Sequence, residues 1–214
     1  MCNLYKTKNS ADEIAALFDA VIAEGARGAN VAEEIFPGMP GFVVRNGDNG
    51  RLVQSMVWGF PLVTREMRAR AEKAGKAARP KPVNNARELG SPFWKSAAAN
   101  PARRCLIPVE CFAEAEGPKG GKTRTWFSLP DEPLFAWAGL WRPSPEWGDV
   151  YAGVMTEAND LVAPVHDRMP VILAPQDQDR WMNGSFEEIL ALQRPADPHR
   201  MEVLRTEQPW TARR

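Results

Sequence analysis

The 214-residue chain lacks several features that would place it at once in a broad class of proteins. It has no apolar run approaching the ~20 residues needed to cross a bilayer and no signal-peptide pattern, so we expect a cytoplasmic protein without a membrane partner. The chain has 27 Lys+Arg and 27 Asp+Glu residues, so its net charge is zero. Overall charge therefore does not indicate a nucleic-acid partner. The three cysteines are an odd number without metal-ligand spacing, which argues against a disulfide framework and favours free thiols in a reducing compartment. We expect no metal site and no cofactor.

What the chain does contain is ordinary globular composition, with 44% hydrophobic and 25% charged residues. That composition and length predict one domain over residues 1–214. We also expect residues 193–214 to form a C-terminal extension, and the protein to be a monomer. The chain also has eight tryptophans, which composition alone cannot divide between core residues and stacking platforms.

Local patterns predict an α+β fold with a mostly antiparallel, barrel-like sheet flanked by helices. The clearest helix is expected over Ser10–Glu24, where Ser10 and Glu13 form a capping box. A Gly47–Gly50 turn between apolar runs predicts a hairpin that ends at Phe60, and Ser91-Pro92 predicts a short helix to about Asn100. Further strands are expected at Cys105–Val109, Thr123–Leu129, Leu134–Trp141, Val150–Thr156, Pro170–Leu173 and His199–Arg205. Helices are expected at Pro175–Met182 and after Ser185.

Cys2 directly follows the initiator methionine and is the most informative residue. Removal of Met1 would leave a cysteine with a free α-amine, which titrates near pH ~8, beside a thiol that titrates near ~8.5. An aldehyde would form an imine on the amine, and the thiol would then close a five-membered thiazolidine. The alternative is that position 2 holds cysteine by chance in a flexible terminus.

Polar residues near predicted strand ends are the other candidates for chemistry. His166, beside Arg168, is either structural or a proton shuttle or phosphate ligand. Glu110, Glu114 and Glu116 follow an apolar strand, where a half-buried carboxylate would have a raised pKa and could act as a general acid or base. Local sequence does not choose among these three.

A basic stretch precedes a polar tetrapeptide that ends in an arginine. Residues 64–81 contain seven Lys/Arg and two acidic residues, which suits either a solvated face or a phosphate-contacting arm. In the tetrapeptide that follows, the Asn85 amide could orient a substrate oxygen and the Arg87 guanidinium could hold a phosphate. Trp58 is the aromatic candidate for base stacking, and it could equally belong to the core.

The order of these motifs resembles the SOS-response-associated peptidase family of abasic-site processing proteins. The resemblance runs from Cys2 to about Met182, through Trp-Gly, Asn-Ala-Arg, Arg-Arg-Cys-Leu-Ile-Pro with a downstream Glu, and His-Asp-Arg-Met-Pro. The sequence departs from the family pattern at three places. Asn3-Leu4 stands where the family has Gly-Arg, and Ala115 stands where the family has an aromatic residue. The 35–40 loop replaces the family's Tyr-Asn-x-x-Pro.

The resemblance implies a role for each candidate. Cys2 would be the nucleophile, Asn85 would position the substrate, Glu114 would be the acid/base, and His166 would stabilise or protonate the opening sugar. Arg87 and Arg168 would hold phosphates, so the implied partner is single-stranded DNA that contains abasic sites. The rival hypotheses are an N-terminal-cysteine amidohydrolase and a non-catalytic nucleic-acid-binding module.

Overall fold

The computed structural model of the chain describes residues 2–210. Met1, whose removal we predict, and the last four residues of the predicted 193–214 extension lie outside the described residues. The helices are α1 (Ala11–Leu17), α2 (Arg65–Lys73), α3 (Lys95–Ala99), α4 (Pro175–Asn183) and α5 (Phe186–Leu192), with single 3-10 turns at Pro101–Arg103 and Pro198–Arg200.

The strands of the first half of the chain are β1 (Tyr5–Lys6), β2 (Ala20–Ile22), β3 (Glu34–Ile35), β4 (Pro40–Gly47), β5 (Gly50–Trp58), β6 (Phe60–Leu62), β7 (Lys81–Val83) and β8 (Asn85–Ala86). Those of the second half are β9 (Arg104–Val109), β10 (Cys111–Glu116), β11 (Thr123–Ser128), β12 (Phe135–Ser144), β13 (Gly148–Glu157), β14 (Arg168–Pro170), β15 (Ile172–Leu173) and β16 (Glu202–Pro209).

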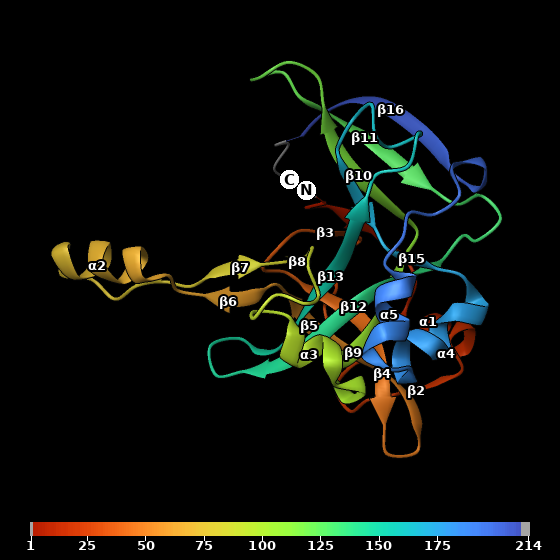
Figure 1. Ribbon diagram of the computed structural model, residues 1–214, viewed down its shortest axis with the longest axis horizontal. Coiled ribbons are helices and arrows are strands. Elements are labelled where there is room, and N and C mark those ends of the chain that lie inside the picture. The colour runs from red at the N-terminus through yellow and green to blue at the C-terminus, as the bar shows by residue number, and fades with distance from the viewer. Residues whose placement is uncertain (1, 211–214) are drawn as a thin grey trace.

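Five strands close into a barrel. The antiparallel order is β13-β12-β9-β4-β5, and a short parallel pairing of β13 with β5 joins the two ends. This arrangement confirms the predicted α+β class with a mostly antiparallel, barrel-like sheet. Helices α1, α4 and α5 lie together on one side of the barrel (Figure 1), while a second sheet, in the order β16-β11-β10-β1-β3, lies at one end. The predicted C-terminal extension therefore supplies β16, an edge strand of that second sheet.

Two buried clusters follow from the alternation of side chains along the barrel strands. The outward face packs against the helices, and the other face gathers Trp58, Trp137, Tyr151 and Cys105. Gly153 makes room for this inner cluster, since an added Cβ would lie 1.9 Å from the Trp137 ring. Strand β1 brings Tyr5 onto the same cluster, where its hydroxyl lies 2.5 Å from that of Tyr151. The barrel therefore holds the N-terminal segment through its own core.

Several predicted elements differ in extent from the observed ones. The Ser10–Glu13 capping box is present, but α1 ends at Leu17, so the prediction of a helix to Glu24 was wrong. Asp19 adopts a left-handed φ of 48°, and the next residues pair with β5 as strand β2 instead. A helix cannot continue through such a residue, and sheet pairing satisfies the following backbone groups.

Three further elements also differ from the predicted ones in their bounds. The segment after Ser91 first makes a turn, so α3 begins only at Lys95. The predicted strand at 170–173 is divided into β14 and β15, which pair with different neighbours. The predicted strand from His199 begins with a 3-10 turn, and β16 starts at Glu202. The hairpin of β4 and β5 is confirmed, with Gly47 opposite Gly50.

Within residues 2–210, no helix is long and apolar enough to cross a membrane. The same residues contain no group of three or more His, Cys, Asp or Glu side chains arranged to hold a metal ion.

Candidate functional site

The main chain at Cys2 is held by two adjacent asparagines. The Asn85 side-chain amide donates to the Cys2 carbonyl at 2.8 Å, and the Asn84 amide donates to the same oxygen at 3.1 Å. Asn84 also donates to the Asn3 side chain at 3.0 Å. These bonds join residues more than 80 positions apart in sequence, so they fix the N-terminal segment against the chain that leaves β7.

Asn85 was a predicted site residue, whereas the equal part played by Asn84 was not foreseen. The only signal in the sequence was its position beside Asn85. The Asn85 Oδ1 atom is buried and has no hydrogen-bond partner among the described residues. A buried acceptor of this kind normally finds a donor, so Asn85 could accept a hydrogen bond from a bound ligand.

The Cys2 thiol is fully buried and lies 3.7 Å from the Leu4 carbonyl oxygen, to which it donates. Burial raises the pKa of this thiol well above its ordinary value, and the negative charge of Glu114 raises it further. Cys2 is therefore a neutral thiol near pH 7. Any reaction in which its sulfur attacks needs a neighbouring group that accepts the proton.

Glu114 is positioned beside Cys2 by the pairing of β1 with β10. The Ala113 N–H donates to the Leu4 carbonyl at 2.9 Å, which anchors the two segments next to each other. The Glu114 side chain is only 2% exposed, and burial raises the pKa of its carboxyl to about 7. The nearby Asp167 charge acts in the same direction. A carboxyl group with this pKa can both give and take a proton near neutral pH.

The structure separates the three glutamates that the sequence left equivalent. Glu110 accepts a hydrogen bond from the Lys8 N–H. Glu116 accepts one from the Thr125 hydroxyl and forms an ion pair with Arg205 at 3.0 Å, and the Thr125 bond lowers its pKa. Glu114 is thus the one of the three that is buried with a raised pKa next to Cys2.

His166 lies in the loop between β13 and β14 and is half-buried. The Arg168 N–H lies 3.0 Å from its Nδ1, and the Arg168 carbonyl oxygen lies 3.3 Å from the same nitrogen. The Asp167 carboxylate lies 3.1 Å from Nδ1. Burial lowers the pKa of the ring and outweighs the Asp167 charge and the Arg168 backbone hydrogen bond, which act in the opposite direction. His166 is therefore mainly neutral near pH 7, and a neutral imidazole can donate one hydrogen bond.

Arg87 and Arg168 line one surface hollow of about 510 Å³, which Glu88 and Glu157 also line. Gln193 donates to the Arg87 carbonyl at 2.6 Å and fixes its backbone. The Arg168 Nε atom is buried without a hydrogen-bond partner among the described residues, although its backbone N–H holds His166. The two predicted arginines thus lie together and close to His166.

Trp58 is part of the core, so the prediction that a base stacks on it was wrong. Its side chain is fully buried, its ring stacks on Tyr151 with centroids 6.4 Å apart, and its Nε1–H donates to the Asn84 carbonyl at 3.1 Å. A ring covered on both faces has none to offer a base. Trp58 instead supports the asparagine pair that holds Cys2.

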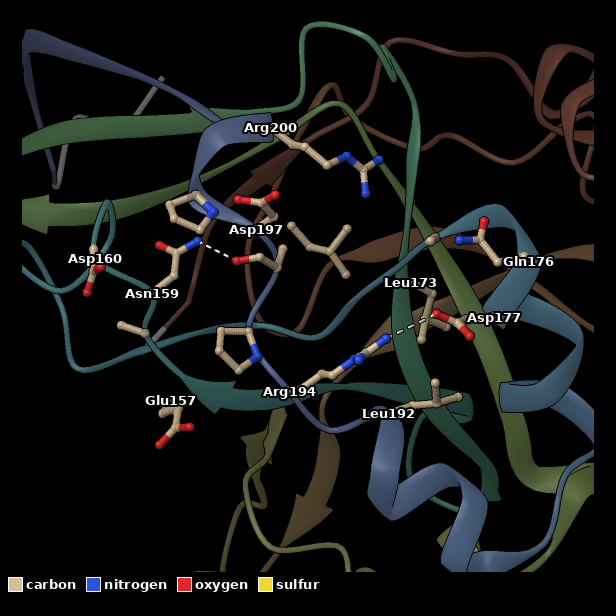
Figure 2. A pocket seen from close by; sticks show the side chains of 16 residues that line it. Glu157, Asn159, Asp160, Leu173, Gln176, Asp177, Leu192, Arg194, Asp197 and Arg200 are labelled. Carbon is tan, nitrogen blue, oxygen red and sulfur yellow. Dashed lines mark hydrogen bonds and ion pairs between the residues drawn. The ribbon is translucent and has the colours of Figure 1, made fainter.

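Another hollow, of about 630 Å³, contains none of the predicted site residues. Figure 2 shows Glu157, Asp160, Asp177 and Asp197 around it, and only two arginines. One of these, Arg194, is paired with Asp177 at 3.7 Å. This excess of acid would repel a phosphate backbone. The hollow that Arg87 and Arg168 line has two arginines and two glutamates, so its charges balance and it is the better match to an anion.

Comparison with known proteins supports one family. Abasic site processing protein YoqW of Bacillus subtilis is 33% identical over 111 residues, and YoaM of the same organism is 32% identical over 115 residues. Each match covers 48% of this chain, together with 49% of YoqW and 48% of YoaM. The chain therefore spans about half the length of the curated relatives it matches.

Solved structures share the fold over nearly the whole chain. A Bacteroides thetaiotaomicron protein aligns with a TM-score of 0.76 at 20% identity, covering 95% of this chain and 91% of that one. A Bordetella bronchiseptica protein aligns with a TM-score of 0.75 at 24% identity, covering 96% and 99%. The profile of the SOS response associated peptidase (SRAP) family matches residues 1–208, and the chain belongs to that family.

Proposed function

We propose that the protein processes abasic sites in single-stranded DNA by forming a thiazolidine crosslink through Cys2 after Met1 has been removed. The observation that carries the proposal is the fixation of Cys2 by Asn84 and Asn85 beside Glu114, a carboxyl group whose pKa is about 7. Relatives named abasic site processing proteins support the choice of substrate.

The proposed reaction needs no cofactor. An abasic deoxyribose is partly an open aldehyde, and the free α-amine of Cys2 would condense with it to give an imine and water. The thiol would then add across the C=N bond, so that a C–S bond forms and the thiol proton passes to nitrogen. An imine on this carbon also permits β-elimination, so we include a weak lyase activity.

Proton transfer in this scheme falls to Glu114 and His166. The carboxyl of Glu114 would take the proton of the buried Cys2 thiol and assist the loss of water, because its pKa allows both states near pH 7. The neutral His166 ring would donate a hydrogen bond to the sugar oxygen as the sugar ring opens. The buried Oδ1 of Asn85 would accept a hydrogen bond from a sugar hydroxyl.

Arg87 and Arg168 would hold the phosphates that flank the sugar. A guanidinium matches a phosphate through paired N–H donors, and both arginines line the same hollow. We also propose that the family's peptidase chemistry includes removal of Met1 by the protein itself.

The direct test uses a uracil-containing oligonucleotide treated with uracil glycosylase. We expect a heat-stable protein–DNA band on a denaturing gel, and its loss in Cys2→Ala and Cys2→Ser, since serine keeps the amine but closes the ring poorly. Mass spectrometry of the active protein should find Met1 absent. A normal yield of stable adduct with either variant would exclude the thiazolidine. Hydrolysis of glutamine would instead favour the amidohydrolase hypothesis. A band shift on a native gel without a covalent adduct would favour the non-catalytic binding module.

A further inference from the structure

A basic arm projects from the body of the molecule (Figure 1). It consists of strands β6 and β7, which pair from Phe60 opposite Val83 to Leu62 opposite Lys81, and of helix α2 beyond them. Helix α2 has no buried residue and Met67 is its only large apolar side chain. The arm tip therefore adds nothing to the core and offers no apolar face to a membrane or a protein groove.

The positive charges of the arm are unpartnered. Of the seven Lys/Arg in residues 64–81, none forms an ion pair with another described residue. A hollow of about 730 Å³ lies between α2 and the returning chain, and Arg70, Lys76, Arg79 and Lys81 line it with no acidic residue among its lining. Like charges gathered around a hollow concentrate a positive potential that attracts an anion.

The root of the arm is also part of the candidate site. Trp58 and Gly59 precede β6, whereas Asn84 and Asn85 follow β7. The Trp58 indole donates to the Asn84 carbonyl at 3.1 Å, and both asparagine amides bind the Cys2 carbonyl. A DNA strand that occupies the site lies at the base of the arm.

We propose that the arm is a phosphate clamp that grips the sugar–phosphate backbone of the DNA flanking the lesion. The inference rests on the proposed function for the identity of the polyanion, since the site's own substrate carries one negative charge at every nucleotide. The nine-residue helix spans about 14 Å and the three-residue strand about 10 Å. At a rise of about 3.4 Å per nucleotide along the axis of a stacked strand, the arm reaches roughly seven nucleotides.

The test compares two variants with equal loss of charge. In the arm variant, Arg70, Lys76, Arg79 and Lys81 become Gln, and in the control variant the exposed Lys8, Arg27, Lys95 and Lys119 become Gln. Binding of lesion-free single strands of 24 and 6 nucleotides is measured by fluorescence anisotropy over a salt series. Circular dichroism should show both variants folded, since α2 buries nothing.

We expect the arm variant to bind the 24-mer at least about tenfold more weakly at low salt, with a smaller slope of log affinity against log salt. Its affinity for the 6-mer, which is too short to contact the site and the whole arm together, should fall by a smaller factor than its affinity for the 24-mer. The affinity of the control variant for the 24-mer and for the 6-mer should stay within about twofold of the wild-type values. An arm variant that loses no more affinity for the 24-mer than the control would overturn the proposal, and would leave an acidic protein as the partner of the arm.

The crosslinking assay separates this failure from failure of the proposed function. If wild-type protein forms no heat-stable adduct but still shows arm-dependent binding of the 24-mer, the crosslinking proposal fails and the clamp stands. If the adduct forms and the arm variant binds the 24-mer like the control, only the clamp fails.

Discussion

Glu114 shows how one buried carboxyl can supply both halves of a proton transfer. Its burial costs the ionised form its hydration, which is why the pKa of the carboxyl rises to about 7. Beside it, the Cys2 thiol is held in the neutral form by the same burial. The pair matches a mechanism in which the sulfur loses its proton only when it attacks.

Replacing Glu114 by Gln should slow crosslinking by at least about tenfold while affinity for DNA changes little. Positioned proton transfer is typically worth ~10²–10⁴ in rate, and glutamine cannot exchange a proton. Single-turnover adduct formation measures the rate, with Glu110→Gln and Glu116→Gln as matched controls. His166→Ala should slow the reaction to a similar degree. If Glu110→Gln were the crippling change, the assignment of the acid/base to Glu114 would fail.

The same carboxyl should affect stability in a pH-dependent manner. Its folded pKa of about 7 exceeds the ordinary 4.5, so wild-type stability falls as pH rises from about 4.5 to 7, and the loss persists above that range. The loss amounts to at most about 3 kcal/mol. The melting temperature of Glu114→Gln relative to that of the wild type should therefore be higher at pH 8 than at pH 5. An equal difference at both pH values would contradict the raised pKa.

At the scale of elements, Gly59 lies where the arm joins the candidate site. This residue has a φ of +120°, and a Cβ added to it would lie 2.3 Å from the Cβ of Pro82 in β7. Two residues after Pro82 comes Asn84, which binds the Cys2 carbonyl. A side chain at Gly59 would push on the strand that leads directly to the site.

Gly59→Ala should therefore slow adduct formation at saturating DNA by about tenfold or more, because small displacements of a reacting group are costly. Gly120→Ala provides the control, since Gly120 also has a positive φ of 93° but nothing within 4 Å of its added Cβ. Melting temperatures of the two variants show how much a side chain at a positive φ costs in stability, separately from the clash with Pro82. A Gly59→Ala protein that melts earlier yet reacts at the wild-type rate would show that the root does not position Cys2.

At the scale of the whole molecule, zero net charge conceals a division of charge between surfaces. The hollow of Figure 2 has an excess of acids. The hollow of Arg87 and Arg168 holds two arginines and two glutamates, and that of the arm is lined by four cations and no acid. Electrostatic attraction to DNA depends on these local surfaces and not on the total.

Arg87→Ala and Arg168→Ala should each lower the slope of log affinity against log salt by about one unit. Each arginine that contacts a phosphate releases about one condensed cation when DNA binds. Titrations at four or more salt concentrations with lesion-free oligonucleotide provide the slope, and Arg27→Ala, whose guanidinium pairs with Asp12, is the control. Unchanged slopes in both variants would mean that these arginines serve the fold.

The amino-acid sequence by itself determined the features that depend on near neighbours. The Ser10–Glu13 capping box, the β4–β5 hairpin at Gly47–Gly50 and the helix that opens at Pro175 each follow from contacts within a few residues. The order of motifs also sufficed for the family, because that resemblance depends on residue identity and not on distance in space.

Tertiary structure decided what depends on burial. Nothing local distinguished Glu114 from Glu110, and nothing local placed Trp58 in the core or Asn84 on the Cys2 carbonyl. Each of these outcomes is set by strands far apart in sequence that close the barrel and bring β1 against β10. The pKa of a carboxyl and the exposure of a ring are sums over such distant neighbours, so only the folded chain defines them.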